Sequence, residues 1–158
     1  MWFFLKNTGT GLAGGYFRFK TNYLKPFPLP EISDNSNIMI DKVNCQLDLN
    51  KDFQSITNQF EKYLVSQFSI NKLTKKLQNW HELEFRDFIK ELNKAIKKTG
   101  GEKLSKIEEM EWMELFETKK AEAQTLKAEI DQTDAAIDQM VYELYGLTEE
   151  EIQIVETN

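Results

Sequence analysis

Three patterns in the sequence contain residue types that can do chemistry, and the first is a set of glycines. Gly9, Gly11 and Gly14 have the G-x-G-x-x-G spacing of loops that hold the pyrophosphate of a dinucleotide. That motif has to follow a strand and open a helix, whereas here a strand-like segment, residues 16–20, comes after it. A tight loop that uses the conformational freedom of glycine is therefore the favoured interpretation.

The other two patterns are a histidine and a row of acids. His81 could move protons, but the sequence shows no nucleophile or metal-ligand set beside it, which favours a structural or solvent-facing role. Asp131, Asp134 and Asp138 share one side of a predicted helix. Without carbonyl ligands they would make a poor cation cage, so a solvated face is favoured. Cys45 is the only cysteine, which favours a reducing compartment, and we expect it to pack as a small apolar residue.

Charge is distributed unevenly along this chain of net charge −6. Residues 1–30 hold four basic and no acidic residues, residues 70–98 hold eight basic and four acidic, and residues 99–158 hold five basic and sixteen acidic. The two basic segments are the candidates for touching phosphate. In the first segment, hydroxyl and basic side chains suit contact with a nucleic-acid backbone. The candidate residues are Lys6, Thr8, Thr10, Arg18, Lys20 and Lys25.

Two arginines differ in what surrounds them. Arg18 lies between aromatic residues in the acid-free segment, and its planar guanidinium can donate two hydrogen bonds to one partner. The alternative is that Phe17 and Phe19 belong to a core and that Arg18 is an ordinary surface residue. Arg86 could also reach DNA, but the nearby acids at positions 87 and 91 favour a partner within its own helix.

Residues 105–146 form the longest predicted helix, because this stretch has no proline, no internal glycine and many good helix formers. Ser105 and Glu108 have the spacing of a capping box at its start, and Gly146 can end it in a left-handed conformation. A second capping-box pattern predicts a short helix over about 148–156.

A second long helix is predicted over residues 36–68. Its apolar residues recur at spacings of three and four residues, with a small phase shift near Leu49. They are Ile40, Val43 and Leu47, followed by Phe53, Ile56, Phe60 and Leu64. The two helices pair antiparallel if residues 69–104 form a cap between them. The sequence thus predicts a mainly α protein: a long, coiled-coil-like antiparallel helical hairpin with a small helical cap and a short N-terminal β remnant.

The apolar start of the chain, residues 2–5, is unusual for a mature N-terminus and indicates a piece of a longer protein. This run has no basic residue before it and ends at Lys6, so neither a signal peptide nor a membrane span is supported. We therefore expect a cytoplasmic protein that does not bind membranes.

Three segments resemble one family of enzymes. Residues 14–32, GGYFRFKTNYLKPFPLPEI, are similar to the closing strand and exit of the TaqI-like C-terminal specificity domain of adenine-specific DNA methyltransferases. Residues 137–156, IDQMVYELYGLTEEEIQIVE, resemble the C-terminal signature of the same group, which includes the type IIG restriction-modification enzymes, and residues 82–92, ELEFRDFIKEL, are also similar. The resemblance implies that residues 1–32 end a target-recognition domain and that residues 33–158 form a helical spacer.

The resemblance implies a terminal piece without chemistry of its own. The family's Asn- or Asp-Pro-Pro-Tyr catalytic motif is absent from the sequence, and so is its glycine-rich S-adenosylmethionine motif. No catalytic, cofactor-binding or metal-binding residue is therefore assigned, and S-adenosylmethionine belongs to the parent enzyme. The implied role is DNA target recognition and spacing, with double-stranded DNA and other domains or a partner subunit as partners. In that role the basic and hydroxyl residues of the first segment would face DNA, and Arg18 would be the best candidate for a base or minor-groove contact, because its guanidinium can donate two hydrogen bonds to one base edge. The alternative is a structural module that docks another domain or subunit without touching DNA.

Overall fold

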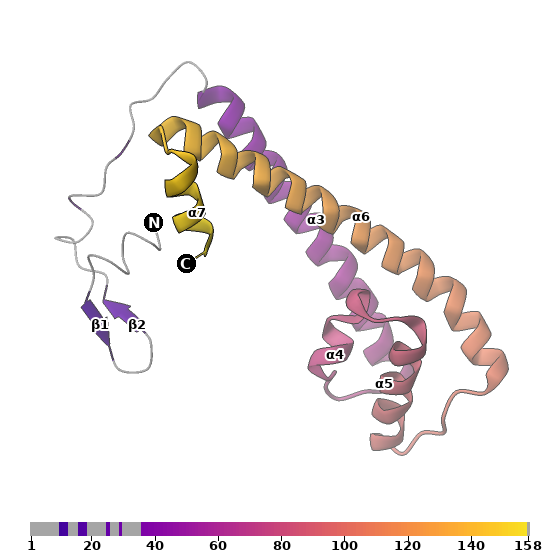
Figure 1. The fold of residues 1–158 in the computed structure, drawn as a ribbon. Helices are drawn as coiled ribbons and strands as arrows, with labels where there is room; N and C mark the ends of the chain where they lie inside the picture. The colour runs from indigo at the N-terminus through magenta and orange to yellow at the C-terminus, as the bar shows by residue number, and fades with distance from the viewer. Residues whose placement is uncertain (1–9, 13–15, 19–24, 26–28, 30–35, 158) are drawn as a thin grey trace. The chain divides into compact units, whose positions relative to one another are not determined.

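The computed structural model describes residues 10–12, 16–18, 25, 29 and 36–157, and it is mainly α-helical. Its elements are β1 (Thr10–Leu12), β2 (Tyr16–Arg18), α3 (Ser36–Phe68), α4 (Lys75–Gln78), the short 3₁₀ helix η1 (Trp80–Glu82), α5 (Phe85–Lys98), α6 (Lys106–Tyr145) and α7 (Glu149–Thr157) (Figure 1). They divide into two units, residues 40–135 and residues 1–39 with 136–158. None of the helices in the described ranges combines the length and the apolar character that crossing a membrane requires.

The predicted helix ends are confirmed to within one residue. At the start of α6, the amide of Ser105 donates to the carboxylate of Glu108 over 2.7 Å, and the amide of Glu108 donates to the hydroxyl of Ser105 over 3.3 Å. At its end, Gly146 has a φ of +63°. Thr148 and Glu151 repeat the reciprocal bonding at 2.8 and 3.4 Å before α7. Each of these ends is set by residues within one helical turn.

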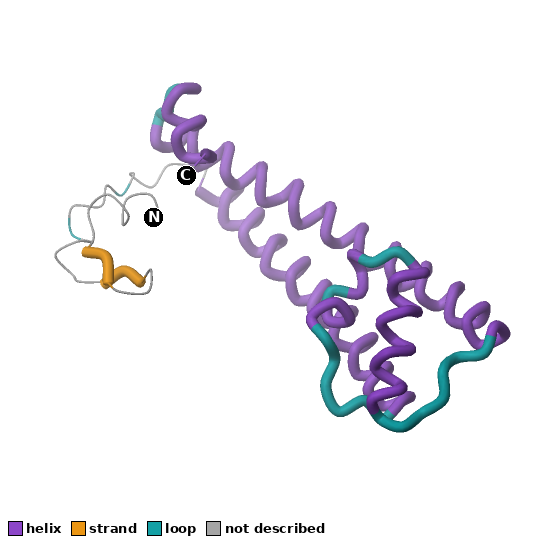
Figure 2. The backbone as a smooth tube through the Cα atoms, turned by 60° about the horizontal axis from the view of Figure 1, so that its bottom comes forward, coloured by secondary structure: helices purple, strands orange, loops and turns teal. Residues whose placement is uncertain are grey.

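The predicted helical hairpin is confirmed within residues 40–135, where α3 and α6 lie side by side in both views (Figures 1 and 2). Phe60 and Leu64 of α3 are buried, as are Phe116, Ala123 and Ile130 of α6. These α6 residues recur at spacings of seven, which keeps them on the face toward α3. Other parts of the chain therefore cover α6 at these three positions.

The cap, formed by α4, η1 and α5, shares its core with the hairpin. Trp80 is fully buried, and its ring centroid lies 4.2 Å from that of Phe60 on α3. Phe88 of α5 stacks on Phe116 of α6 at 4.4 Å. Aromatic contacts of this kind tie all three parts into one cluster, so the cap is held as a rigid element.

The apolar pattern predicted for α3 is confirmed in its second half, where Phe60 and Leu64 are buried and Phe53 and Ile56 pack against the core, but its first half is exposed. Ile40, Val43 and Leu47 are 54%, 39% and 54% exposed, whereas Lys42 and Gln46 are half-buried. Two neighbouring faces of this helix carry apolar residues, and the packing of the Phe53–Phe68 segment decides which of them turns toward the partner. The prediction failed for the first half because a spacing of three and four residues identifies a helix without fixing its rotation.

Two further predictions are corrected. Cys45 is exposed, because it lies on a face of α3 that neither α6 nor the cap covers. The glycine-containing segment 10–12, expected as part of a loop, is strand β1, which pairs antiparallel with β2. The strand predicted over residues 16–20 is confirmed for residues 16–18. The local sequence of residues 10–12 does not indicate a strand, because its extended conformation depends on hydrogen bonds to β2.

Candidate nucleic-acid interface

The residues predicted to face DNA fall partly on described positions. Thr10 and Arg18 are direct partners across β1 and β2, so their Cα atoms lie about 4.5–5.5 Å apart in this antiparallel pair. Lys25 is in a turn and is exposed. The other three candidates, Lys6, Thr8 and Lys20, lie outside the described residues. The strand pairing therefore places the main chain of Thr10 directly opposite that of Arg18.

Two polar bonds join the cap to α6. The Nζ atom of Lys120 lies 2.9 Å from the Oε1 atom of Glu84, and Lys120 is itself buried. Gln124 donates from Nε2 to the main-chain carbonyl of His81 over 3.3 Å. Sequence reasoning missed the role of Lys120, although its position four residues after Phe116 places it on the same buried side of the helix.

His81 packs in the seam between the cap and α3. Its ring meets the ring of Phe53 edge-on, at 5.1 Å, and that of Trp80 at 5.8 Å. The Nδ1 atom is buried and has no hydrogen-bond partner among the described residues. Burial lowers the pKa of His81 below its usual value, Glu82 opposes the shift, and Lys127 adds to it. The histidine is therefore a structural residue that packs in its neutral form.

We expect acid to weaken the contact between the cap and α3. The pKa of His81 is lower in the folded chain than in the unfolded one, so its contribution to stability is full above about pH 6.5 and is lost as the pH falls through the folded value. Urea unfolding followed by circular dichroism at pH 7 and pH 5 measures the difference. His81→Phe should flatten this dependence, and an unchanged pH dependence in that variant would assign it to other groups.

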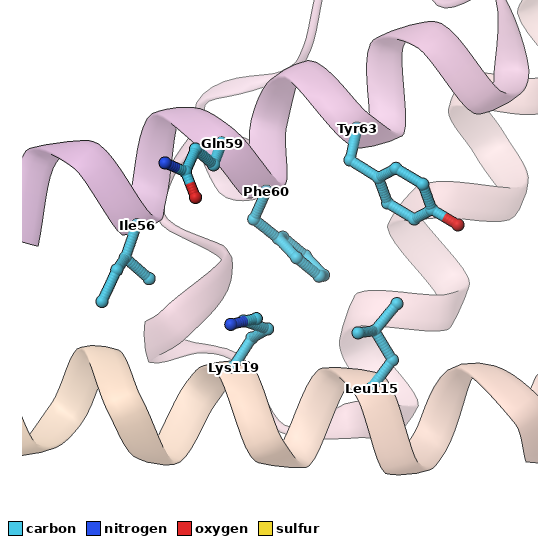
Figure 3. A pocket seen from close by; sticks show the side chains of 6 residues that line it. All are labelled: Ile56, Gln59, Phe60, Tyr63, Leu115 and Lys119. Carbon is cyan, nitrogen blue, oxygen red and sulfur yellow. The ribbon is translucent and has the colours of Figure 1, made fainter.

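An apolar hollow opens between α3 and α6 (Figure 3). It encloses about 290 Å³, and the side chains that line it are Ile56, Gln59, Phe60, Tyr63, Leu115 and Lys119. A second hollow of about 740 Å³ continues from Ile56 and Gln59 toward Leu126. Sequence reasoning did not identify this groove, because the apolar spacing of a helix is the same whether a neighbouring helix covers its apolar side fully or in part.

Side chains that can bind a metal ion are not gathered at one place in the described part of the chain. Within these ranges, no three His, Cys, Asp or Glu side chains are grouped so that they could hold a metal ion. Asp131, Asp134 and Asp138 are exposed; the first pairs with Lys127, and the second accepts a hydrogen bond from Gln46 at 3.5 Å.

The comparisons with known proteins place the helical part of the chain in a family. A model described as a domain of unknown function, DUF8810, matches residues 32–141, which is more than half of the chain. The chain belongs to the DUF8810 family. The DUF8810 match contains the cap and nearly all of α3 and α6, and it starts after the strand pair. No curated protein and no solved structure matches the chain.

Proposed function

We propose that this chain is the DNA target-recognition and spacer portion of a site-specific adenine DNA methyltransferase or type IIG restriction-modification enzyme. In this role it positions the parent enzyme on double-stranded DNA, and S-adenosylmethionine and the methyl transfer belong to the parent's other domains. The resemblance of residues 14–32, 82–92 and 137–156 to that group supports the proposal. A cytoplasmic location, where the DNA of such a system is found, is part of the same proposal.

The observation that carries the proposal is the register of the two strands. It sets Thr10 opposite Arg18 within a basic segment that contains no acid. An arginine fork can donate two hydrogen bonds to guanine, while hydroxyl residues contact phosphate, so the pair has the components for reading and for positioning. The long helices α3 and α6 suit a spacer, since the 40 residues of α6 extend over about 60 Å.

Replacing Arg18 with Ala should relax sequence discrimination. Duplexes that the full chain enriches from a random pool provide the preferred site, and binding to that site is then compared with binding to a single-base variant. We expect the difference in binding free energy between the two duplexes to shrink by about 1–3 kcal/mol. Arg18→Lys is the matched control, because it keeps the charge but loses the planar fork.

Two results would count against this reading. A pool that yields no preferred sequence would remove the recognition role, and an Arg18→Ala chain with undiminished discrimination would remove this arginine from it. If Arg18→Lys discriminates as well as the wild type, charge alone is sufficient and the base contact is not supported.

A docking module is the second candidate, and the apolar groove between α3 and α6 favours it. Tyr63 lines this groove and is 47% exposed, which leaves apolar surface for another helix to cover. The salt dependence of DNA binding separates the two functions. Binding that falls steeply with salt supports the DNA role, whereas a folded chain that binds no duplex at low salt supports docking alone.

A further inference from the structure

The surface of the cap is unusually rich in basic side chains. Eight cations between positions 72 and 98 are all exposed: Lys72, Lys75, Lys76, Arg86, Lys90, Lys94, Lys97 and Lys98. They come from α4, α5 and the segment just before α4. We refer to this set as the basic cap face.

These cations differ from those of α6 in how they are paired. All four lysines of α6 form ion pairs, for example Lys119 with Glu122 at 2.7 Å. On α3, Lys51 pairs with Asp48 at 2.8 Å, whereas Lys42 and Lys62 have no ion-pair partner among the described residues. On the basic cap face, Lys94 is the one member with an ion-pair partner among the described residues. The remaining cations therefore face solvent without a compensating carboxylate in contact.

Arg86 illustrates the difference, because its sequence neighbours predicted a partner that it does not have. Glu91 was one of the two expected partners, but it accepts from the Nζ atom of Lys94 at 2.7 Å. This hydrogen bond, opposed by desolvation and assisted by the charges of Lys94, Lys76 and Lys90, lowers the pKa of Glu91. The buried carboxylate of Glu91 thus binds Lys94 and is close enough to Lys76 and Lys90 to feel their charges. Arg86 is left exposed and unpaired in the described part of the chain.

The spacing of the cations makes an extended surface. Arg86, Lys90, Lys94 and Lys97 recur at four, four and three residues along α5, which keeps them on one side of the helix. From first to last they extend over about 16 Å. Lys76 joins them from α4, since its charge acts on Glu91. The opposite side of α5 is buried in the aromatic core, so the core anchors the helix that carries these cations.

The chemistry of this face suits a long polyanion. Successive phosphates on one DNA strand are about 3.4 Å apart along the duplex axis, so the α5 row spans the length of about five of them. An anionic membrane surface is a poorer match, because membrane-binding helices insert apolar side chains between the cations. On α5 the apolar side chains are buried or half-buried, and Asp87 is the exposed residue beside Arg86.

We infer that the basic cap face is a second DNA-binding surface, in which Lys76, Arg86, Lys90, Lys94 and Lys97 bind the phosphate backbone of the duplex without reading its sequence. The inference rests on the proposed function for its choice of duplex DNA as partner. It adds a contact within the matched family region, separate in sequence from the strand pair that contains Arg18. Contacts to the DNA backbone fix the position of the protein on the duplex and add to its affinity, while discrimination between DNA sequences depends on the base contact.

A charge-matched pair of variants tests the inference. Lys76, Lys90 and Lys97 are changed together to Gln in the full chain, and the control changes Lys51, Lys106 and Lys127, which are also exposed but pair with acids. Both variants lose three positive charges. The probe is a fluorescent 20-base-pair duplex titrated at several NaCl concentrations. Circular dichroism establishes that both variants keep their helices.

The cap variant should bind at least about tenfold more weakly at low salt, and the slope of log K against log salt should fall by about 2–3, close to 0.9 for each lost phosphate contact. The control should change binding by less than about threefold. Equal losses of duplex affinity in both variants would show that net charge alone explains the effect, and would overturn the inference. Binding of the chain to phosphatidylserine vesicles but not to the duplex would overturn it as well.

The same duplexes separate this inference from the proposed function. The cap variant should weaken binding to the preferred and the altered site by the same factor, whereas Arg18→Ala should change their ratio. If the cap variant binds both duplexes more weakly but Arg18→Ala leaves their ratio unchanged, backbone binding by the basic cap face is supported and base reading by Arg18 is not. If Arg18→Ala changes the ratio but the cap variant binds as the wild type does, base reading is supported and the inference about the basic cap face is overturned.

Discussion

Replacing Trp80 with Ala should lower the free energy of unfolding by about 3–5 kcal/mol. Trp80 is fully buried at the junction of the cap with both long helices, with ring contacts to Phe60 of α3 and Phe116 of α6. Truncation removes the transfer free energy of the indole and leaves a cavity whose walls belong to three separate elements. Because these walls are anchored independently, they can collapse only in part.

Urea unfolding followed by far-ultraviolet circular dichroism measures this loss, and Trp112 remains as a fluorescent reporter on α6. Trp80→Phe is the control. The Nε1 donor of Trp80 is buried and has no hydrogen-bond partner among the described residues, so phenylalanine removes an unsatisfied group while keeping much of the ring. A Trp80→Ala chain as stable as Trp80→Phe would show that the junction is not the centre of the core.

Leu64→Asp should have the largest effect of the substitutions considered, a loss of more than about 4 kcal/mol. Leu64 is fully buried on α3, and the burial of Glu61 one turn earlier already raises the pKa of that carboxyl. A second carboxylate here would be both desolvated and close to a like charge. The total stability of a small domain is about 5–15 kcal/mol, so this change consumes much of it.

The neighbouring residue gives a matched control. Val65 is 38% exposed on the same helix, and Val65→Asp introduces the same group where water can reach it. We expect that variant to lose less than about 1.5 kcal/mol. If Leu64→Asp does not fold, Leu64→Ala supplies a measurable loss of about 2–5 kcal/mol. Similar losses for both Asp variants would contradict the burial difference between the two positions.

The features that sequence reasoning predicted correctly depend on nearby residues. The start of α6 follows from Ser105 and Glu108, and its end follows from Gly146, because capping and left-handed glycine are local effects. The extent of α3 follows from an unbroken run of helix-compatible residues. The features that sequence reasoning missed depend on packing between distant segments.

Ile40, Cys45 and Arg86 illustrate this second group. Whether Ile40 is covered depends on the rotation of α3 against α6, and the same rotation leaves Cys45 exposed. Arg86 has no ion pair because Lys94 occupies the carboxylate of Glu91. For the candidate site, the basic character of residues 70–98 was visible in the sequence. The buried side of α5 was also predictable from its apolar spacing, whereas the approach of Lys76 of α4 to the carboxylate of Glu91 followed only from the packing of the two helices.

The exposed thiol of Cys45 has a practical consequence. It is the only thiol in the chain, so a maleimide dye would label one position without any mutagenesis. That position is 15 residues, or about 22 Å along the helix axis, from Phe60 in the aromatic cluster. A fluorophore attached there would tumble with α3, and the indole emission of the core would remain available as an independent signal in the same sample.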